Sequence, residues 1–408
     1  MSAVRTLPNE EAEELLALTR DIADAELRPR VADFEARGEF PRELFGLLGK
    51  AGLLGLPYDE AYGGGGQPYE VYLQVVEELS SAWLAVGLGV SVHTLACYPT
   101  AAFGTDEQRA RFLPDMLSGD RLGAYCLSEP ESGSDAAALS TRAVRETDGY
   151  RVNGVKAWVT HGGVADFYNL MVRTSDEGSR GISTLLAEAQ TPGLTPQRPE
   201  RKMGLASSPT AQVVLDDARV PADRLLGAEG QGFRIALSAL DGGRLGISAC
   251  AVGVAQAALD YATGYARERK QFGHPIIDFQ GVSFMLADMA TQVEAARSLY
   301  LAAARLRDAG RPYGDRAAMA KLFSTDAAMR VTTDAVQVLG GAGYVEDHPV
   351  ERFMREAKVL EIVEGTNQVQ RMVIGRALAS EHRAQRGAER VDNLASEHRA
   401  QRGAERVD

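Results

Sequence analysis

The sequence predicts a multidomain α+β protein with a helical N-terminal domain, a middle domain of β-strands and a helical C-terminal domain. Apolar residues recur at three- and four-residue steps up to about Gly119, as in helices. Short runs of β-branched and aromatic residues follow, and Ala-rich helical spacing returns after Gly232. We expect the domains at residues 1–120, 121–230 and 231–380, followed by a polar tail at 381–408.

The N-terminal domain is expected to contain several packed amphipathic helices. Apolar residues at helical steps begin at Leu15 and Ile22, whereas the glycine-rich run 62–68 predicts a loop. That run lacks the Lys-Ser/Thr of a phosphate-binding P-loop. The stretch 70–103 is apolar and free of Lys and Arg, which predicts buried helices. His93 lies within it and is expected to be a hydrogen-bonded core residue rather than a ligand.

The middle domain is predicted from runs that are typical of strands. Residues 150–155, 165–172 and 210–215 carry β-branched and aromatic side chains between Gly, Pro and Asp. Asp148-Gly149 and Asn153-Gly154 are favourable turn dipeptides. After Gly232, Ala and Gly fill the inward helix positions. This pattern predicts long bundle helices whose backbones approach closely.

Composition excludes several classes of function. The chain has 44 Lys and Arg against 56 Asp and Glu, a formal charge of −12, which argues against binding nucleic acid or an anionic membrane. Its three Cys are odd in number and far apart, so we expect neither disulfides nor a metal site. An acidic run at 9–14 stands where a secretory signal would carry positive charge, and we expect no later stretch to be apolar for long enough to span a bilayer. We therefore expect a cytoplasmic protein.

The C-terminal tail contains a duplication. Residues 378–392 recur letter for letter as residues 394–408, with Asn393 between the copies. The segment is polar and offers little apolar area to bury. We interpret the second copy as an artefact of sequence assembly and predict disorder for at least part of it.

The stretch 358–371 contains the candidate catalytic residue, Glu364. This carboxylate precedes Gly365, which tolerates unusual backbone angles, and follows an apolar run, so it can point into a cavity. Apolar walls raise a carboxyl pKa, which suits a general base acting on a weakly acidic C–H bond. The alternative is a solvent-facing Glu364 that caps the following helix.

Three further stretches favour the catalytic interpretation. The small and hydroxyl residues of 124–135 expose backbone N–H groups, which can bind a heterocycle edge or a phosphate. Residues 157–160 offer a flat indole and a hydroxyl. Residues 267–273, followed by Gln280, form a cationic patch that suits a pyrophosphate. Each stretch is common alone, but their occurrence in this order is not.

In these motifs the sequence resembles the acyl-CoA dehydrogenase family. The family's Leu-Ser/Thr-Glu-Pro-x-x-Gly-Ser-Asp signature is met by 127–135, and its Trp-x-Thr by 158–160. Its Gln-x-Leu-Gly-Gly-x-Gly is met by 337–343, and its Glu-Gly-Thr-x-x-x-Gln-Arg by 364–371. The similarity is closest to the short-chain branch, through 240–246 and the Ala-Met-Ala-Lys of 318–321.

The resemblance implies a fold and a set of site residues. It implies a β-barrel-like middle domain, a C-terminal four-helix bundle, FAD as cofactor and a homotetramer that completes each FAD site. The isoalloxazine and ribityl portions would meet residues of the β domain, namely Tyr125, Leu127, Ser128, Ser134, Trp158, Val159 and Thr160. The pyrophosphate would lie near Thr366, Asn367 and Gln368. The FAD of a neighbouring subunit would meet Arg269, Phe272, Gln280, Gln337, Gly340 and Gly341. Acyl-CoA would contact Ser134, Asp241, Arg244 and Gly365.

The resemblance also implies a reaction in fatty-acid β-oxidation. Glu364 would take the α proton of an acyl-CoA while the β hydrogen leaves as hydride to flavin N5, giving a trans-2-enoyl-CoA. Electron-transferring flavoprotein would accept the electrons. Gly243 stands where isovaleryl- and long-chain-type members carry the base as Glu, and 78–108 lacks the Arg of glutaryl-type members, which argues against those branches. Val363 replaces the usual Tyr before the base, so chain length stays open.

Three alternatives remain from the sequence. The acyl group could be bound to a carrier protein instead of CoA. An oxidase or flavin monooxygenase of the same fold would use oxygen directly, and fast reoxidation in air would reveal it. A nucleic-acid-binding member, as in alkylation-response proteins, is disfavoured by the acidic balance.

Overall fold

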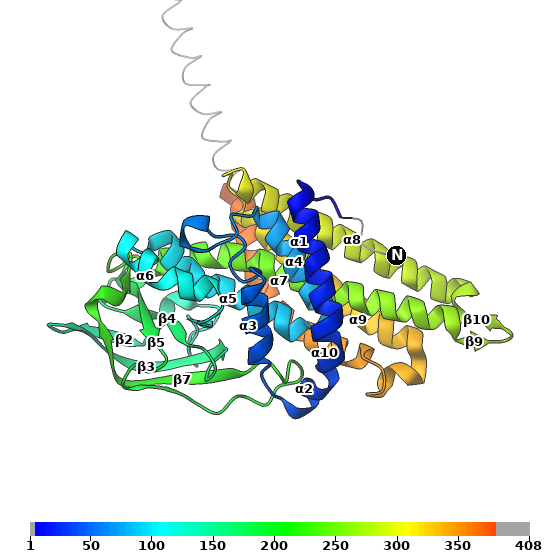
Figure 1. Ribbon diagram of the computed structural model, residues 1–408, viewed down its shortest axis with the longest axis horizontal. Helices are drawn as coiled ribbons and strands as arrows, with labels where there is room; N and C mark the ends of the chain where they lie inside the picture. Colours follow the sequence, from blue (N-terminus) through cyan, green and yellow to red (C-terminus); the bar gives the residue numbers. More distant parts are fainter. Residues whose placement is uncertain (1–4, 381–408) are drawn as a thin grey trace, which may run out of the picture.

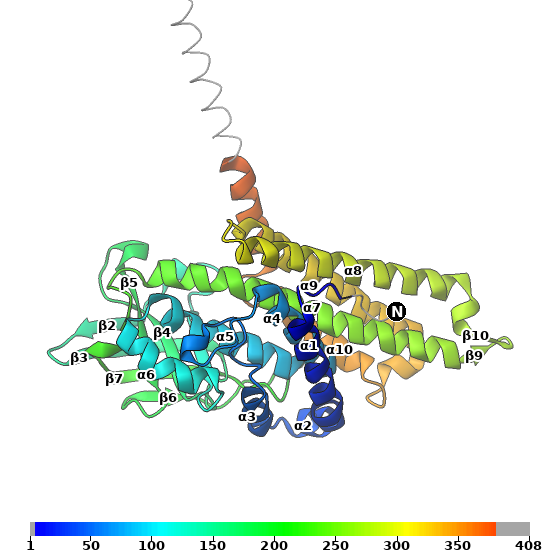
Figure 2. The same cartoon turned by 45° about the horizontal axis from the view of Figure 1, so that its top comes forward.

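The computed structural model describes residues 5–380. Figure 1 shows an elongated molecule with a β-sheet at one end, the β9–β10 hairpin at the other and long helices between them. Figure 2 shows the same arrangement from a second direction. One apolar core joins the N-terminal helices to the C-terminal helices, and a second core fills the sheet.

Six α-helices precede the sheet in the described chain. They are α1 (Glu10–Ile22), α2 (Val31–Arg37), α3 (Arg42–Lys50), α4 (Tyr69–Ala82), α5 (Leu84–Phe103) and α6 (Asp106–Leu117). Local caps start two of them. The Asn9 side chain accepts from Ala12 N, and Thr105 and Gln108 form a capping box at α6. His93 is a satisfied core residue, as expected, because its ring contacts Met116 O and Gly123 N.

The middle sheet contains eight strands of the described chain. They are β1 (Gly123–Cys126), β2 (Arg142–Arg145), β3 (Gly149–Thr160), β4 (Phe167–Arg173), β5 (Ile182–Glu188), β6 (Leu194–Pro196), β7 (Thr210–Pro221) and β8 (Leu225–Leu226). Their order is β6-β7-β3-β2-β4-β5-β8, with β1 parallel to β4. The β3–β7 register shifts between Lys156 and Val159. Such an irregularity bends a strand and redirects a side chain, here that of Trp158.

The C-terminal part is helical. It contains α7 (Gly232–Glu268), the hairpin β9 (Lys270–Gln271) and β10 (His274–Pro275), α8 (Gln280–Asp308), α9 (Gly314–Leu339), α10 (Val350–Ala357) and a helix over 367–380. Glycines let α7 approach the N-terminal helices. A Cβ at Gly246 would lie 2.1 Å from Ser91 Oγ, and one at Gly253 would lie 2.4 Å from Glu77 O.

Contrary to the expectation from the sequence, two helices of the described chain, α5 and α7, are long and apolar enough by composition to span a membrane. Their most apolar windows are 89% and 83% buried inside the protein. The apolar surface of each helix is therefore used by the core.

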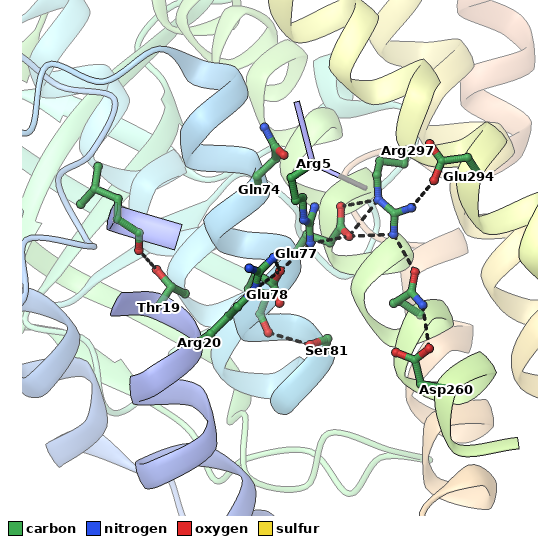
Figure 3. A network of polar contacts seen from close by, with 12 residues as sticks. Arg5, Thr19, Arg20, Gln74, Glu77, Glu78, Ser81, Asp260, Glu294 and Arg297 are labelled. Atoms are coloured by element: carbon green, nitrogen blue, oxygen red, sulfur yellow. Dashed lines mark hydrogen bonds and ion pairs between the residues drawn. The ribbon is translucent and has the colours of Figure 1, made fainter. Parts of the chain in front are cut away.

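A buried ionic cluster fastens α4 to the bundle (Figure 3). Glu77 on α4 accepts from Arg297 on α8 at 3.0 Å and from Tyr300 at 2.5 Å, and Arg5 approaches the same carboxylate at 2.9 Å. Because a buried charge is costly unless it is paired, this cluster fixes the relative positions of the two helices. The fixed position of α4 matters for the site, because Tyr69 at the start of α4 donates a hydrogen bond to Gly242 O on α7.

The predicted fold class is confirmed: helical N- and C-terminal domains flank a middle sheet. The predicted disorder of the duplicated tail concerns residues 381–408, which lie outside the described residues.

Candidate active site

Glu364 occupies a tight turn between the 3₁₀ segment η9 (Lys358–Glu361) and the helix over 367–380. Its φ is 52° and that of Gly365 is 89°, so two successive residues adopt left-handed backbone angles. Both carboxylate oxygens are buried, and neither has a hydrogen-bond partner among the described residues. Burial raises the pKa of Glu364 to about 7, against the positive charges of Lys321 and Arg244. The alternative of a solvent-facing Glu364 is therefore wrong.

The carboxylate of Glu364 lies against α7. A Cβ at Gly243 would lie 1.9 Å from Glu364 Oε2, so only glycine leaves room for it. Beside this contact, Arg244 Nη1 donates to Asp241 Oδ1 at 2.6 Å, and the Arg244 side chain is buried. Asp241, Arg244 and Gly365 are thus brought to the same place as Glu364.

A narrow cavity of about 20 Å³ lies beside Gly243, between α4, α5 and α7. Its walls include Tyr69, Leu95 and Tyr98. Tyr98 Oη and Ser238 Oγ are 2.6 Å apart, and this hydrogen bond links α5 to α7 across the cavity. The cavity is close in size to one water molecule, so it has little free depth.

The loop after β1 and the end of β3 are held together by a buried ion pair. Ala157 N donates to Ser128 O at 2.9 Å, and Lys156 Nζ donates to Leu127 O at 3.2 Å. Lys156 Nζ also contacts Glu129 Oε1 at 2.7 Å. Although burial raises the pKa of Glu129, the charge of Lys156 lowers it to about 2, so the carboxylate stays ionised.

The same loop connects the sheet to α7 and to Glu364. Tyr125 donates to Ala236 O at 3.3 Å, and Leu127 packs on Ala236. Burial raises the pKa of Tyr125, and the nearby carboxylate of Glu364 adds to this effect. Tyr125, Leu127 and Ser128 therefore lie between the end of β3 and the turn that carries Glu364.

Trp158 presents an unusual exposed surface. Its φ is 60° and its side chain is 64% exposed, whereas Val159 is buried and Thr160 is half-buried. Ser134 is also exposed. An exposed indole held on a bulged strand is a suitable platform for a planar ring.

The residues 366–368 start a helix, but their side chains differ. Thr366 Oγ1 accepts from Val369 N at 3.3 Å, as an N-cap does, and Gln368 is exposed. Asn367 is buried instead, and its amide donates to Thr325 and Asp326. The N–H groups in the first turn of a helix have no partners within the helix, so this turn can bind an anion through its backbone.

The remaining predicted cofactor residues lie elsewhere. Arg269 ends α7, Phe272 lies in the β9–β10 hairpin and Gln280 starts α8, at the end of the molecule away from the sheet (Figures 1 and 2). Gln337, Gly340 and Gly341 are exposed where α9 ends. Phe272 is 91% exposed. This second group does not join the first within one chain.

Two residues that hold the turn are not among the predicted site residues. Gln370 Nε2 donates to Gly365 O at 2.8 Å, and Lys321 Nζ donates to the same oxygen at 3.0 Å. The sequence contained a signal for Lys321. Lys321 lies at helical steps from Ala317, Thr325 and Ala328 on α9, so the lysine falls on a buried face of small residues.

The comparisons with known proteins agree with this geometry. Sequence profiles described as acyl-CoA dehydrogenase N-terminal, middle and C-terminal domains match residues 9–120, 124–218 and 230–379. An acyl-CoA dehydrogenase of Bacillus subtilis (strain 168) is 47% identical over 363 residues, which cover 88% of this chain and 96% of that protein.

Two solved structures share the fold. Butyryl-CoA dehydrogenase from Megasphaera elsdenii has a TM-score of 0.90 at 42% identity, covering 92% of this chain and 100% of its own. A chain in a structure described as the electron transferring flavoprotein of Acidaminococcus fermentans has a TM-score of 0.90 at 43% identity. The match covers 92% of this chain and 99% of that one.

The fold, the buried carboxylate and these matches define a flavin-dependent oxidoreductase. Two features of the site fit FAD: the exposed indole of Trp158, and the helix start at Thr366, whose backbone N–H groups can bind an anion. The chain belongs to the acyl-CoA dehydrogenase family. It dehydrogenates acyl-CoA thioesters, and FAD is its cofactor.

Proposed function

We propose that the protein dehydrogenates short-chain acyl-CoA thioesters with Glu364 as the base that removes the α proton. The observation that carries this proposal is the buried, unpaired carboxylate of Glu364, whose pKa is raised to about 7. A base with a pKa near the working pH combines a useful ionised fraction with sufficient basicity. Burial also excludes the water that would otherwise solvate the carboxylate.

The thioester oxygen needs a hydrogen-bond donor when the α proton leaves, because negative charge develops there. The backbone N–H of Glu364 has no acceptor in the described part of the chain and can supply that donor. The left-handed φ of 52° fixes how this N–H and the carboxylate are arranged on one residue. Asp241 and Arg244 lie next to the base and are proposed to contact the acyl-CoA, as are Ser134 and Gly365.

The residues proposed to hold FAD fall into two groups. Tyr125, Leu127, Ser128, Trp158, Val159 and Thr160 would contact the ring and ribityl portions, and the helix start at Thr366, Asn367 and Gln368 would bind the pyrophosphate. For Asn367 we propose a backbone contact, because its side chain is buried and bonded inside the protein. FAD, when bound, supplies the acceptor for the hydride that leaves the β carbon.

A short acyl chain is supported by the Tyr98–Ser238 hydrogen bond, which links α5 to α7 across the space beside Gly243. A long chain would have to displace this bond or one of the buried helices. The similarity to butyryl-CoA dehydrogenase of Megasphaera elsdenii supports the same substrate class.

A homotetramer is proposed because large apolar residues, and residues that are predicted to contact FAD, remain exposed on the single chain. Phe284 on α8, Phe323 on α9 and Met372 near the C-terminus are exposed, and such patches mark interfaces. Arg269, Phe272, Gln280, Gln337, Gly340 and Gly341 would then reach the FAD of a neighbouring subunit.

The electron acceptor and the compartment are also proposals. The similarity to a chain from the Acidaminococcus fermentans structure supports an electron transferring flavoprotein as acceptor. Cys97, Cys126 and Cys250 are all buried free thiols, which fits a reducing cytoplasm.

Anaerobic bleaching of the flavin tests the proposal. The purified holoenzyme would be mixed with straight, branched and aromatic acyl-CoAs of increasing length. We expect fast bleaching by butyryl-CoA and slow bleaching by long chains. Bleaching by a carrier-protein thioester but by no acyl-CoA would show that the substrate is bound to a carrier protein. Fast reoxidation of the bleached enzyme in air would favour an oxidase.

A further inference from the structure

Lys321 is a buried ammonium group that the proposed reaction does not use directly. It lies on α9 with no exposed surface. Its two hydrogen-bond partners are neutral: Gly365 O at 3.0 Å and Asn367 Oδ1 at 2.9 Å. No carboxylate in the described part of the chain forms an ion pair with it. A buried charge without a paired counter-ion is costly, so its presence calls for a reason.

The Lys321 bonds converge on the turn that carries the base. Gly365 O accepts from both Lys321 Nζ and Gln370 Nε2, at 3.0 and 2.8 Å. This carbonyl belongs to the residue directly after Glu364, so its direction constrains the left-handed turn. Asn367 is held in turn by Thr325, one helical turn after Lys321 on α9.

The charge of Lys321 also acts on the Glu364 carboxylate. Burial lowers the pKa of Lys321 to about 8, against the negative charge of Glu364. Conversely, the positive charges of Lys321 and Arg244 lower the pKa of Glu364. The other ionisable groups that interact with this pair come from five elements, namely Tyr69 on α4, Tyr125 on β1, Cys250 on α7, Glu361 on η9 and Asp326 on α9.

We propose that Lys321 is a positioning residue for the dehydrogenation: its ammonium group holds the Gly365 carbonyl and thereby aims the Glu364 carboxylate. This inference rests on the proposed role of Glu364 as base. A purely structural role for Lys321 would change thermal stability alone. The positioning role also changes the rate and the pH dependence of proton removal.

The test compares Lys321→Met and Lys321→Arg with wild type. Met keeps the volume but removes the charge and the donors, whereas Arg keeps the charge on a differently shaped group. Thr332→Val on the same helix is the matched control, because Thr332 is buried and its hydroxyl bonds only to backbone carbonyls of its own helix. FAD occupancy and thermal midpoint are recorded for each protein before kinetics.

The readout is the rate of anaerobic flavin bleaching by butyryl-CoA between about pH 6 and pH 9. We expect Lys321→Met to lower the rate at neutral pH by about 10²-fold, as a misplaced catalytic group does. Its pH inflection should move to higher pH, because the cation that favours the carboxylate is gone. Lys321→Arg should keep the inflection near that of wild type while losing rate.

A Lys321→Met enzyme with full FAD and the wild-type rate and inflection would overturn the proposal, as would an equal change in Thr332→Val. If Lys321→Met fails to bind FAD, Lys321→Arg decides: a lowered rate with an unmoved inflection supports the role, and an unchanged rate overturns it. If wild type itself is bleached by no acyl thioester, the proposed function fails instead. The two failures are therefore distinguishable.

Discussion

The carboxylate of Glu364 occupies the space that a side chain at Gly243 would fill. A Cβ built at position 243 would lie 1.9 Å from Oε2 and 2.8 Å from the carboxyl carbon of Glu364. The space between α7 and the turn that carries Glu364 therefore holds one side chain, which comes either from position 243 or from position 364. This explains physically why a chain with its base at position 364 carries glycine at position 243.

Gly243→Ala should therefore disturb the base directly. We expect the rate of anaerobic bleaching by butyryl-CoA to fall by about 10²-fold, because the carboxylate must move away from its position. Gly264→Ala is the matched control: it lies on the same helix, and its added Cβ meets no atom within 4 Å. Equal rates in the two variants would show that the 243 contact does not constrain Glu364.

The pH dependence of bleaching follows from the environment of Glu364. Burial raises its pKa to about 7, so the ionised base predominates only above that pH. The bleaching rate should rise with pH through a midpoint near pH 7 and reach its maximum before Lys321, whose pKa is about 8, loses its positive charge. Rapid mixing of enzyme with butyryl-CoA over a pH series measures this midpoint. A bleaching rate that is already maximal near pH 5 would contradict this prediction, because the pKa of Glu364 would then not be raised by burial.

Arg269 should act on the cofactor of a neighbouring subunit. A charge-assisted hydrogen bond to phosphate contributes about 2 kcal/mol, so Arg269→Ala should weaken FAD binding by roughly tenfold or more. Arg311→Ala removes an equally exposed cation near the other end of α8 and serves as control. FAD content after dialysis and the mass of the assembly are the measurements. Full flavin retention by Arg269→Ala would remove the residue from the FAD site.

Glu356 on α10 should make stability depend on pH. Burial raises its pKa to about 8, against the nearby positive charge of Arg352, whereas an unfolded Glu titrates near about 4.3. Between those values the folded state holds a proton that the unfolded state lacks, so stability falls as pH rises through this window. Glu356→Gln cannot lose this proton and should flatten the dependence.

Thermal midpoints at about pH 6 and about pH 9 compare wild type, Glu356→Gln and the exposed control Glu346→Gln. A Glu356→Gln protein that is strongly destabilised at both pH values would mean that Glu356 is ionised and paired with Arg352. In that case the Arg352 contact, 3.7 Å long, would matter more than burial.

The sequence predicted the three-part fold well because each part has its own hydrophobic period. An apolar stretch without Lys or Arg, a run of β-branched and aromatic residues and an Ala- and Gly-rich stretch are local signals, and the structure has α4, β3 and α7 at these places. The turn at Glu364 was also predictable, because Gly365 follows an apolar run. Burial of its carboxylate was one of two interpretations that the local sequence left open, since burial depends on Gly243, which is more than a hundred residues away.

Side-chain direction accounts for what the sequence did not predict. Motif matching assigned Thr366, Asn367 and Gln368 one shared role, but only the structure places the Asn367 amide inside the protein. Lys321 was part of a recognised motif without a role of its own. Its importance appears only when its two acceptors are known, because hydrogen-bond partners across two elements leave no local trace in the sequence.

The most direct test of the account is anaerobic bleaching of Glu364→Gln by butyryl-CoA. Glutamine keeps the shape of the side chain, so the variant should bind FAD normally. Its amide cannot accept the α proton. We expect its flavin to stay oxidised under conditions in which the wild-type flavin is bleached. Bleaching of Glu364→Gln at the wild-type rate would contradict the account, because another group would then remove the proton.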